Sequence, residues 1–299
     1  MNVLSLFDGM SCGQIALNRL GIKYDNYFAS EIDKYAMKVT EANYPNTRQM
    51  GSVEFINGVN LPKIDLLFGG SPCQGFSFAG KRLNFSDPRS KLFFEFVRIL
   101  KETKPKYFLL ENVKMKKESQ NIITEYLGVE PIEINSNLVS AQNRRRLYWT
   151  NIPGVQQPKD KEIYLKDIIE EGVLSFSQKS QTLLATIYKE NAKSMVKRNK
   201  KGLLVGPELT DFGQYKGPKL MIREKSKCVR SSGRGSYDRH EWDSVDKLHY
   251  RKLTPTECER LQTVPDNYTN HVSNTQRYKM LGNGWTVDVI AHIFKNMEL

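Results

Sequence analysis

Short apolar runs alternate with helical patterns through the first half of the chain. One apolar run covers residues 3–7 and stops at Asp8 and Gly9, and a helical spacing follows over 14–20 until Gly21. Further apolar runs occupy 27–29, 64–68 and 107–110, and a helical pattern over 91–102 separates the last two. This alternation predicts an α/β fold whose parallel sheet is covered by helices on both faces.

Polar and small residues follow each of the predicted strands. They are Asp8 and Gly9, Glu31, Gly69 and Gly70, and Glu111 with Asn112. In open α/β sheets, ligands bind beyond the carboxyl ends of the strands. We therefore expect a functional site at this edge.

The pattern changes at about residue 154. A lysine-rich stretch over 189–201 and a Gly/Ser/Arg-rich stretch over 225–239 interrupt short strand-like runs. Regular structure returns where Thr254 can cap a helix that begins at Pro255, with Glu257 as the capping-box acid. A helix is also predicted over 287–294. We expect a first lobe over 1–153, a smaller lobe over 154–250, and a C-terminal segment, 251–299, that returns to the first lobe.

Composition and charge narrow the class of protein. The 299 residues are 39% hydrophobic and 26% charged, which is typical of a globular chain. The formal net charge of +12 attracts polyanions, so nucleic acid is the first candidate partner, and a merely soluble basic protein is the alternative. No apolar run approaches the roughly 20 residues of a membrane span, and no signal peptide is evident, so we expect an intracellular, cytoplasmic protein without a membrane partner.

The four cysteines are Cys12, Cys73, Cys228 and Cys258, and they form no CxxC pair. We expect reduced thiols and no metal. Cys73 follows Pro72 after a predicted strand, among glycines that leave room for a substrate, which favours a nucleophile over a small buried hydrophobe.

Two further patterns carry candidate chemistry. Glu111 after its strand is either a helix-capping residue or a catalytic acid. Gln142, Arg144 and Arg146 alternate along an extended segment, so we expect their side chains to converge on one site rather than form a solvated basic run.

The loop over 7–13 follows the first strand, and Glu31 lies about 20 residues on, where an acid binds ribose hydroxyls. The loop has neither a full GxGxxG pattern nor a Walker lysine. A simple glycine turn is the alternative, but a nucleoside cofactor without a phosphate, such as S-adenosylmethionine, fits the pattern better.

Four segments, 69–75, 111–113, 142–146 and 251–261, together resemble the cytosine-5 DNA methyltransferases. Segments 6–9, 92–96, 151–154 and 281–287 resemble the catalytic domain of the animal de novo enzymes, and the compact chain resembles bacterial or phage members. The resemblance implies a Rossmann-like, class I S-adenosylmethionine-dependent methyltransferase fold with a smaller target-recognition lobe, acting on double-stranded DNA.

The resemblance also implies roles for individual residues. Cys73 would attack a cytosine flipped out of the duplex, Glu111 would engage its N3 and amine, Arg146 would hold O2, and Arg144 would order the thiol and the acid. The cofactor residues implied are Phe7, Asp8, Gly9, Met10, Gly13, Glu31, Ile32, Ser52, Val53, Asn283 and Trp285. The DNA-binding residues implied are Gln74, Arg89, Arg230, Ser231 and Arg234.

Two departures and two alternatives accompany this resemblance. Ser52 stands where the family usually carries an acid, and Lys114 follows the 111–113 segment. An RNA methyltransferase is one alternative, although the Cys-Phe-Thr signature of that branch is missing from the second lobe. A catalytically silent DNA-binding subunit is the other. The sequence does not indicate the DNA target sequence, whether the protein works with a restriction enzyme, or its oligomeric state.

Overall fold

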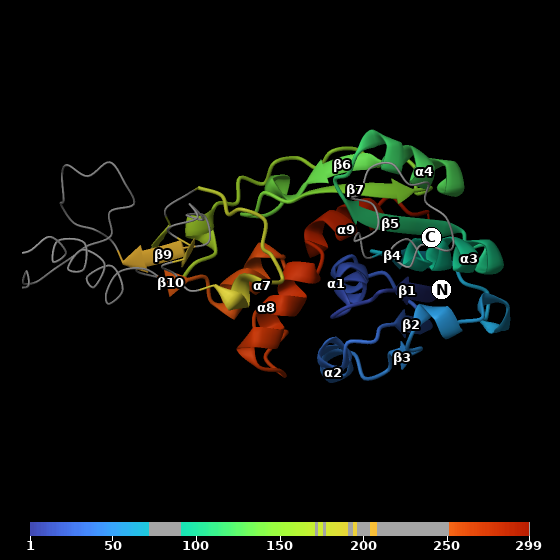
Figure 1. Ribbon diagram of the computed structural model, residues 1–299, viewed down its shortest axis with the longest axis horizontal. Helices are drawn as coiled ribbons and strands as arrows, with labels where there is room; N and C mark the ends of the chain where they lie inside the picture. Colours follow the sequence, from blue (N-terminus) through green and yellow to red (C-terminus); the bar gives the residue numbers. More distant parts are fainter. Residues whose placement is uncertain are drawn as a thin grey trace, which may run out of the picture.

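The computed structural model describes residues 1–71, 91–170, 173–175, 178–190, 194–195, 204–207 and 251–298. A large α/β body carries a seven-stranded sheet, and a small three-stranded sheet lies at the opposite end of the molecule (Figure 1). Several residues singled out in the sequence lie outside the described residues, namely Cys73, Gln74, Arg89, Cys228, Arg230, Ser231 and Arg234.

The large sheet has the strand order β3-β2-β1-β4-β5-β7-β6. Its strands are β1 (Asn2–Leu6), β2 (Asn26–Ser30), β3 (Arg48–Gln49), β4 (Leu66–Gly69), β5 (Tyr107–Val113), β6 (Ile132–Asn135) and β7 (Arg145–Thr150). The first five strands pair in parallel, as predicted, but β7 runs antiparallel to both β5 and β6. The expectation of a wholly parallel sheet is therefore wrong. The nine residues between β6 and β7 are too few for a crossover connection, so these strands form an antiparallel pair.

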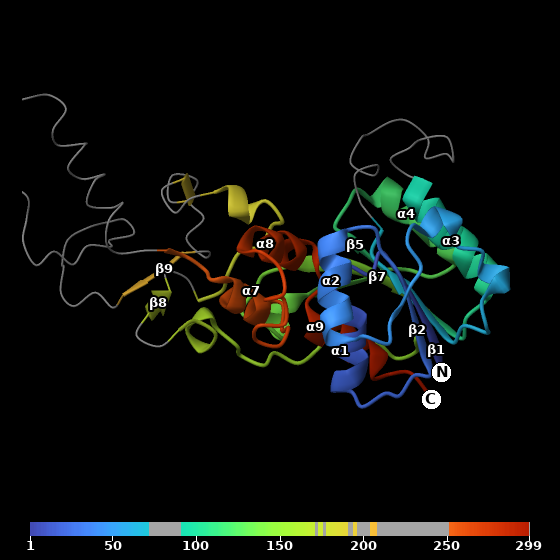
Figure 2. The same ribbon diagram turned by 90° about the horizontal axis from the view of Figure 1, so that it is seen from below.

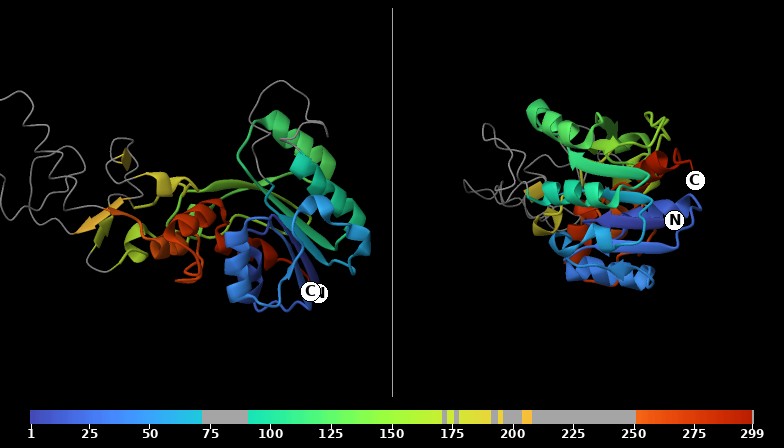
Figure 3. Two further views of the ribbon diagram at one scale, coloured as in Figure 1. Left: turned by 60° about the horizontal axis from the view of Figure 1, so that its bottom comes forward. Right: turned by 90° about the vertical axis from the view of Figure 1, so that its right-hand side faces the viewer.

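Helices cover both faces of this sheet, as Figures 2 and 3 show. They are α1 (Cys12–Arg19), α2 (Lys34–Asn43), α3 (Lys91–Thr103), α4 (Lys117–Leu127) and α9 (Val287–Phe294). Two more helices, α7 (Pro255–Leu261) and α8 (Asn274–Asn283), lie between the large sheet and the small one (Figures 1 and 2). Short 3₁₀ turns are η1 (Val53–Phe55), η2 (Gly58–Asn60), η3 (Ser136–Leu138), η4 (Leu165–Asp167) and η5 (Ile187–Lys189). Alternate residues of β1 enter different cores: Val3 packs with α1 and α9, and Leu4 packs with α3.

Local signals in the sequence predicted several elements correctly. The Thr254 hydroxyl accepts the backbone N–H of Glu257, and the Glu257 carboxylate accepts the backbone N–H of Thr254, which confirms the capping box at the start of α7. Helix α9 has the predicted bounds. Strand β5 is longer than predicted, because β7 continues to pair with it after β4 has ended at Gly69. Glu111 and Asn112 therefore lie inside the strand rather than after it.

The small sheet is antiparallel and has the order β10-β9-β8. It consists of β8 (Val173–Ser175), β9 (Leu204–Pro207) and β10 (Arg251–Lys252). Figure 1 shows it beyond α7 and α8, away from the large sheet. Among the helices that the structure describes, none is long and apolar enough to cross a membrane.

Candidate active site

A cavity of about 460 Å³ lies where β1, β2, β4 and β5 end. Residues from six separate segments of the chain line it. They are Phe7, Asp8, Gly9, Cys12, Glu31, Asp33, Ala36, Gly70, Ser71, Glu111, Asn112, Val113, Arg144, Arg146, Gln276, Lys279, Met280, Gly282, Asn283, Gly284 and Trp285. The polar residues that follow the predicted strands therefore meet in one cavity.

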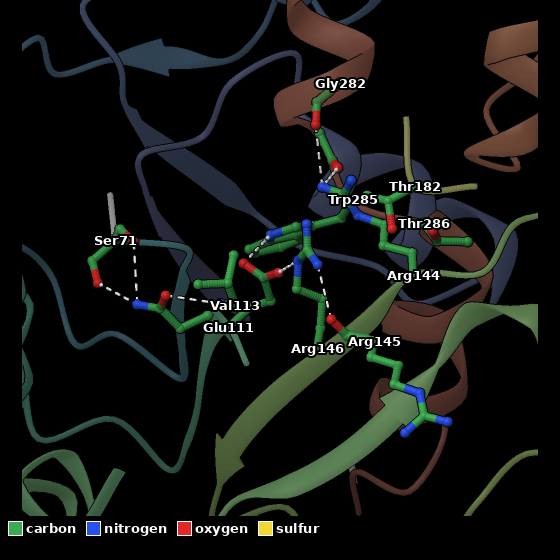
Figure 4. Close-up of polar contacts among 12 residues, drawn as sticks. Ser71, Glu111, Val113, Arg144, Arg145, Arg146, Thr182, Gly282, Trp285 and Thr286 are labelled. Carbon is green, nitrogen blue, oxygen red and sulfur yellow. Dashed lines mark hydrogen bonds and ion pairs between the residues drawn. The ribbon is translucent and has the colours of Figure 1, made fainter. Parts of the chain in front are cut away.

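Glu111 is held by two donors on opposite sides of its carboxylate (Figure 4). Arg146 Nε lies 2.9 Å from Oε1, and Trp285 Nε1 donates to Oε2 at 3.2 Å. All three side chains line the cavity, although Trp285 is more than 130 residues away from the two others in sequence. This contact joins β5, β7 and the C-terminal segment at one carboxylate.

Gly70, which directly follows β4, permits this arrangement because it has no side chain next to the Glu111–Trp285 contact. A methyl group on Gly70 would lie 2.9 Å from Glu111 Oε2 and 3.0 Å from Trp285 Nε1. Next in the chain, Ser71 is fixed by Asn112, whose Nδ2 donates to both the carbonyl and the hydroxyl of Ser71 at 3.3 Å. The chain is thus anchored to β5 two residues before Cys73.

Arg144 is buried and its guanidinium donates to three backbone carbonyls, whereas Arg146 pairs with Glu111 and donates to one carbonyl, Arg145 O, at 2.8 Å. The Arg144 guanidinium donates to Leu183 O at 3.2 Å, Gly282 O at 3.2 Å and Gly284 O at 3.0 Å. Burial, together with the charge of Arg146, lowers the pKa of Arg144 to about 10. Arg144 therefore ties β7 to the C-terminal segment and to the segment that contains Leu183.

Gln142 does not join the two arginines in the cavity. Its side chain is buried and bonds to Leu261 O, Gln262 Oε1 and Leu183 N instead. Strict alternation does not reach position 142, because β7 begins only at Arg145 and Gln142 forms an isolated bridge with Ser180. The expected convergence of three side chains thus holds for the two arginines only.

The loop after β1 presents its backbone to the cavity. Phe7, Gly9 and Ser11 have φ angles of 58°, 60° and 65°, in the left-handed region. A methyl group on Gly9 would have no atom within 4 Å, so open space reaches the backbone there. The N–H of Gly9 donates to Glu31 Oε2 at 2.8 Å, and Glu31 Oε1 accepts the N–H groups of Ile32 and Asp33. The loop and Glu31 therefore form one unit.

Asp8 is a partly buried acid within this loop. It accepts hydrogen bonds from Tyr27 Oη at 2.7 Å and Ser11 Oγ at 2.6 Å. Burial raises the pKa of Asp8 to about 6, and the charge of Glu31 acts in the same direction. Its hydroxyl partners therefore offset only part of the cost of burying the charge.

Several residues of the implied cofactor set lie outside the cavity lining. Met10 is buried in the core, and a methyl group on Gly13 would lie 2.3 Å from Phe68, so Gly13 allows α1 to pack on β4. Ser52 Oγ accepts the N–H of Glu54 at the start of η1, and Val53 is buried in the core. Ile32 is 76% exposed. Phe7, Asp8, Gly9, Glu31, Asn283 and Trp285 do line the cavity.

The described cysteines are both buried. Cys12 lines the cavity with Sγ 3.8 Å from Trp285 O, and burial raises its pKa to about 12. Cys258 is fully buried, and burial raises its pKa strongly as well. Neither thiol forms a disulfide. The described ranges contain no group of three or more His, Cys, Asp or Glu side chains that could hold a metal ion.

Sequence reasoning missed the wall formed by α8, which contributes Gln276, Lys279 and Met280. Residues 274–283 are mostly polar and show no wide apolar stripe, although Ser273 before them suits a helix start. It also missed Asp33 and Ala36. These residues follow Glu31 by two and five positions, so the position of Glu31 could have indicated them. Lys114, whose meaning was open, forms an ion pair with Glu133 at 2.9 Å.

Comparisons with known proteins agree with this geometry. The model of the C-5 cytosine-specific DNA methylase family matches residues 1–299. The chain is 31% identical to the type II methyltransferase M1.ScrFI of Lactococcus lactis subsp. cremoris, over 99% of this chain and 77% of that protein. It is 27% identical to the type II methyltransferase M.HhaI of Haemophilus parahaemolyticus, over 99% of this chain and 94% of that protein.

The fold is likewise that of a solved methyltransferase. The structure of Entamoeba histolytica methyltransferase EhMeth superposes with a TM-score of 0.68 at 19% identity, covering 99% of this chain and 97% of that one. The Rossmann-like methyltransferase fold implied by the sequence is therefore confirmed, with a mixed rather than parallel sheet. The chain belongs to the C-5 cytosine-specific DNA methylase family and is a DNA (cytosine-5) methyltransferase.

Proposed function

We propose that this enzyme methylates a cytosine that it flips out of duplex DNA, through a covalent bond between Cys73 and C6 of the base. The family transfers a methyl group from S-adenosylmethionine to C5 of cytosine in DNA. One observation carries the proposal: the Glu111, Arg144 and Arg146 side chains and the Phe7–Gly9 loop line a single cavity. A base at one end and a cofactor at the other would therefore meet inside it.

The cofactor end of the cavity, which comprises the loop over 7–9, Glu31, Asn283 and Trp285, suits S-adenosylmethionine. The volume of about 460 Å³ lies within the range of roughly 300–1,000 Å³ typical of small-molecule sites. Glu31 lies at the end of β2, where its carboxylate can accept ribose hydroxyls. The bound cofactor would supply an electrophilic methyl group on a sulfonium. Met10, Gly13, Ile32, Ser52 and Val53 would shape the surroundings of this site.

The catalytic end comprises Glu111, Arg144 and Arg146, and Cys73 would act there. Cytosine C5 becomes nucleophilic only when a nucleophile adds to C6. The Cys73 thiolate would form the S–C6 bond, and the displaced electron pair would make C5 a nucleophile. Bound S-adenosylmethionine would supply the methyl group to C5 and would be left as a neutral thioether. Loss of the C5 proton to a base returns the electron pair that breaks the C6–S bond.

Glu111 and Arg146 would stabilise the charge that builds on the ring during this addition. The Glu111 side chain, fixed by Arg146 and Trp285, would in its protonated form donate to N3 and would accept a hydrogen bond from the exocyclic amine. Arg146 would hold the O2 carbonyl. Arg144 would act as a positioning residue, since its donors are engaged by three backbone carbonyls.

Recognition of DNA would fall to the residues outside the described ranges. We propose that residues 154–250 form a target-recognition lobe, that 1–153 form the catalytic lobe, and that 251–299 complete it. Gln74, Arg89, Arg230, Ser231 and Arg234 would contact DNA, with Lys225 and Lys227 neutralising phosphates. The net charge of +12 supports a partner that is a polyanion.

The covalent step can be tested with duplex DNA that carries 5-fluorocytosine at the target. Fluorine cannot leave as the C5 proton does, so we expect a stable protein–DNA complex in the presence of S-adenosylmethionine. Cys73→Ala should abolish this complex on a denaturing gel.

Cys12→Ala is the matched control, because Cys12 is a second cysteine at the cavity. Its raised pKa makes it a poor nucleophile, so this variant should still form the complex. A complex that survives Cys73→Ala and is lost in Cys12→Ala would assign the nucleophile to Cys12 instead. Labelling of tRNA but not of duplex DNA by the unmodified enzyme would overturn the choice of substrate.

A further inference from the structure

An ion pair joins two walls of the cavity at its rim. Asp33 Oδ2 and Lys279 Nζ lie 2.8 Å apart, and both residues line the cavity. The two side chains are 31% and 43% exposed, so the pair faces solvent on one side and the cavity on the other. We propose that this ion pair, the Asp33–Lys279 clasp, positions the two walls of the cofactor site and slows release of the cofactor.

The two walls come from opposite ends of the chain. Asp33 follows Glu31 by two residues and leads into α2, which contributes Ala36. Lys279 lies on α8, four residues before Asn283, and α8 also contributes Gln276 and Met280. The clasp therefore sets the separation between the proposed ribose-binding acid and the C-terminal residues of the same site.

The clasp holds the end of α2 that borders the cavity. At the other end of α2, Asn43 Nδ2 donates to Tyr268 O at 3.0 Å, which ties that end to the segment before α8. The end of α2 that lines the cavity is the one that Asp33 holds. Loss of the clasp would free the wall next to Glu31 while leaving the far end of α2 attached.

Asp33 uses separate oxygens for its two contacts. Oδ1 accepts the N–H of Tyr35 and so caps α2, whereas Oδ2 accepts Lys279. Partial burial raises the pKa of Asp33, but the hydrogen bond and the charge of Lys279 outweigh it and lower the pKa overall. The hydrogen bond that Lys279 donates to Asp33 raises the pKa of Lys279. Both groups are therefore charged at neutral pH, and Asp33→Asn can remove the charge while keeping the cap.

The clasp rests on the proposed function, because it acts on the cofactor only if this cavity binds it. Because the pair carries no net charge, it should slow the release of S-adenosylmethionine and of the product S-adenosylhomocysteine equally, although only the first has a sulfonium. A partly exposed pair contributes modestly, and we expect about a two- to fivefold effect on Kd. Salt should weaken it.

The test measures Kd by calorimetry and release rates by stopped-flow fluorescence, with Trp285 in the cavity as the reporter. Asp33→Asn and Lys279→Gln should each raise Kd for both ligands about two- to fivefold, mainly through faster release. The double variant should match either single variant, because both remove the same interaction. Lys279→Arg should restore the unmodified value.

Asp266→Asn is the matched control. It breaks the Arg260–Asp266 pair, which has a distance of 2.6 Å and similar exposure but does not line the cavity, so Kd should not change. In the unmodified enzyme, high salt should bring Kd toward that of the variants, which tests the clasp without any substitution.

Additive effects of the two substitutions would overturn the clasp. So would a Lys279→Gln variant that loses affinity for DNA while its Kd for S-adenosylmethionine is unchanged, because Lys279 would then be a DNA contact. If the unmodified enzyme bound neither ligand, the proposed cofactor site itself would be refuted, and this outcome is distinct from equal binding by enzyme and variants.

Discussion

The two ends of the cavity are held in different ways. At the catalytic end, side chains hold one another: Arg146 and Trp285 fix the two oxygens of Glu111. At the cofactor end, backbone groups form the site: the Glu31 carboxylate accepts three backbone N–H groups, and the adjoining loop adopts left-handed conformations at Phe7 and Gly9. The first end depends on which side chains are present, and the second depends on a backbone shape.

This difference bears on how each end responds to substitution. Replacing one member of a side-chain network leaves its partners unsatisfied inside the protein. A backbone N–H persists through most substitutions, so the cofactor end should tolerate changes that keep its φ angles. Glycines and the residues that set the loop conformation are then the sensitive positions at that end.

The largest expected effect comes from Glu111→Gln at the catalytic end. A glutamine keeps the size of the side chain but cannot transfer a proton to N3 of the base as a carboxyl group can, so methyl transfer should fall by about 10²- to 10⁴-fold. Binding of S-adenosylmethionine should stay within about twofold, since Glu111 does not touch the proposed ribose site. Transfer of labelled methyl groups to DNA and calorimetry measure the two quantities. Residual activity within tenfold of the unmodified enzyme would remove Glu111 from catalysis.

Lysine substitutions distinguish the role of Arg144, which directly precedes β7, from that of Arg146, which lies in it. Arg144→Lys cannot satisfy three backbone carbonyls from one ammonium group, so unfolding should become easier by about 2 kcal/mol. Arg146→Lys keeps a cation beside Glu111 and should cost less than about 1 kcal/mol, while methyl transfer drops. Urea unfolding measures both. The reverse order of stabilities would show that Arg144 is not the anchoring residue.

Two glycines, Gly9 in the loop after β1 and Gly13 in the first turn of α1, test the cofactor end. A methyl group on Gly13 would lie 2.3 Å from Phe68, so Gly13→Ala should destabilise the fold by about 1–3 kcal/mol through overpacking. Gly9→Ala meets no atom within 4 Å but has a φ of 60°, so it should cost about 1 kcal/mol and lower cofactor affinity by filling open space. Thermal melts and calorimetry distinguish the two. Loss of affinity in a fully stable Gly13→Ala would move Gly13 into the cofactor site.

The parts that could be predicted from sequence are those set by local patterns. Apolar runs located the strands that end at Asp8, Glu31 and Gly70, and the Thr254–Glu257 spacing located α7. The position of Glu111 near the cofactor residues follows from topology, because the carboxyl ends of parallel strands lie at one edge of the sheet. Its contact with Arg146 does not follow, because it requires β7 to run antiparallel to β5. For the residues set by local patterns, the spacing along the sequence is enough to indicate their position in the fold.

The parts that could not be predicted depend on tertiary packing. Gly9 and Gly13 look alike in the sequence, yet one faces open space and the other faces Phe68. Gln142 appeared to share a face with Arg144, but β7 begins only at Arg145. The wall formed by α8 comes from a mostly polar segment nearly 250 residues after Glu31, and no pattern in either segment reports that they meet.

Asp8 is the exception at the cofactor end, because hydroxyl side chains hold it, and it offers the last and smallest test. Its pKa is raised to about 6 by burial, so the folded protein binds a proton more tightly than the unfolded chain does. Stability should therefore fall as pH rises from about 4 to 6, and the cost of the charge persists above pH 6. Asp8→Asn removes that cost but loses hydrogen bonds to a charged acceptor, so a net gain of about 1 kcal/mol, or about 2 °C in Tm, is expected at pH 7.5. At pH 4 the variant should show no gain. A variant less stable than the unmodified protein at pH 7.5 would mean that Tyr27 and Ser11 stabilise the charged carboxylate by more than burial disfavours it, and the cofactor end would then depend on side chains as the catalytic end does.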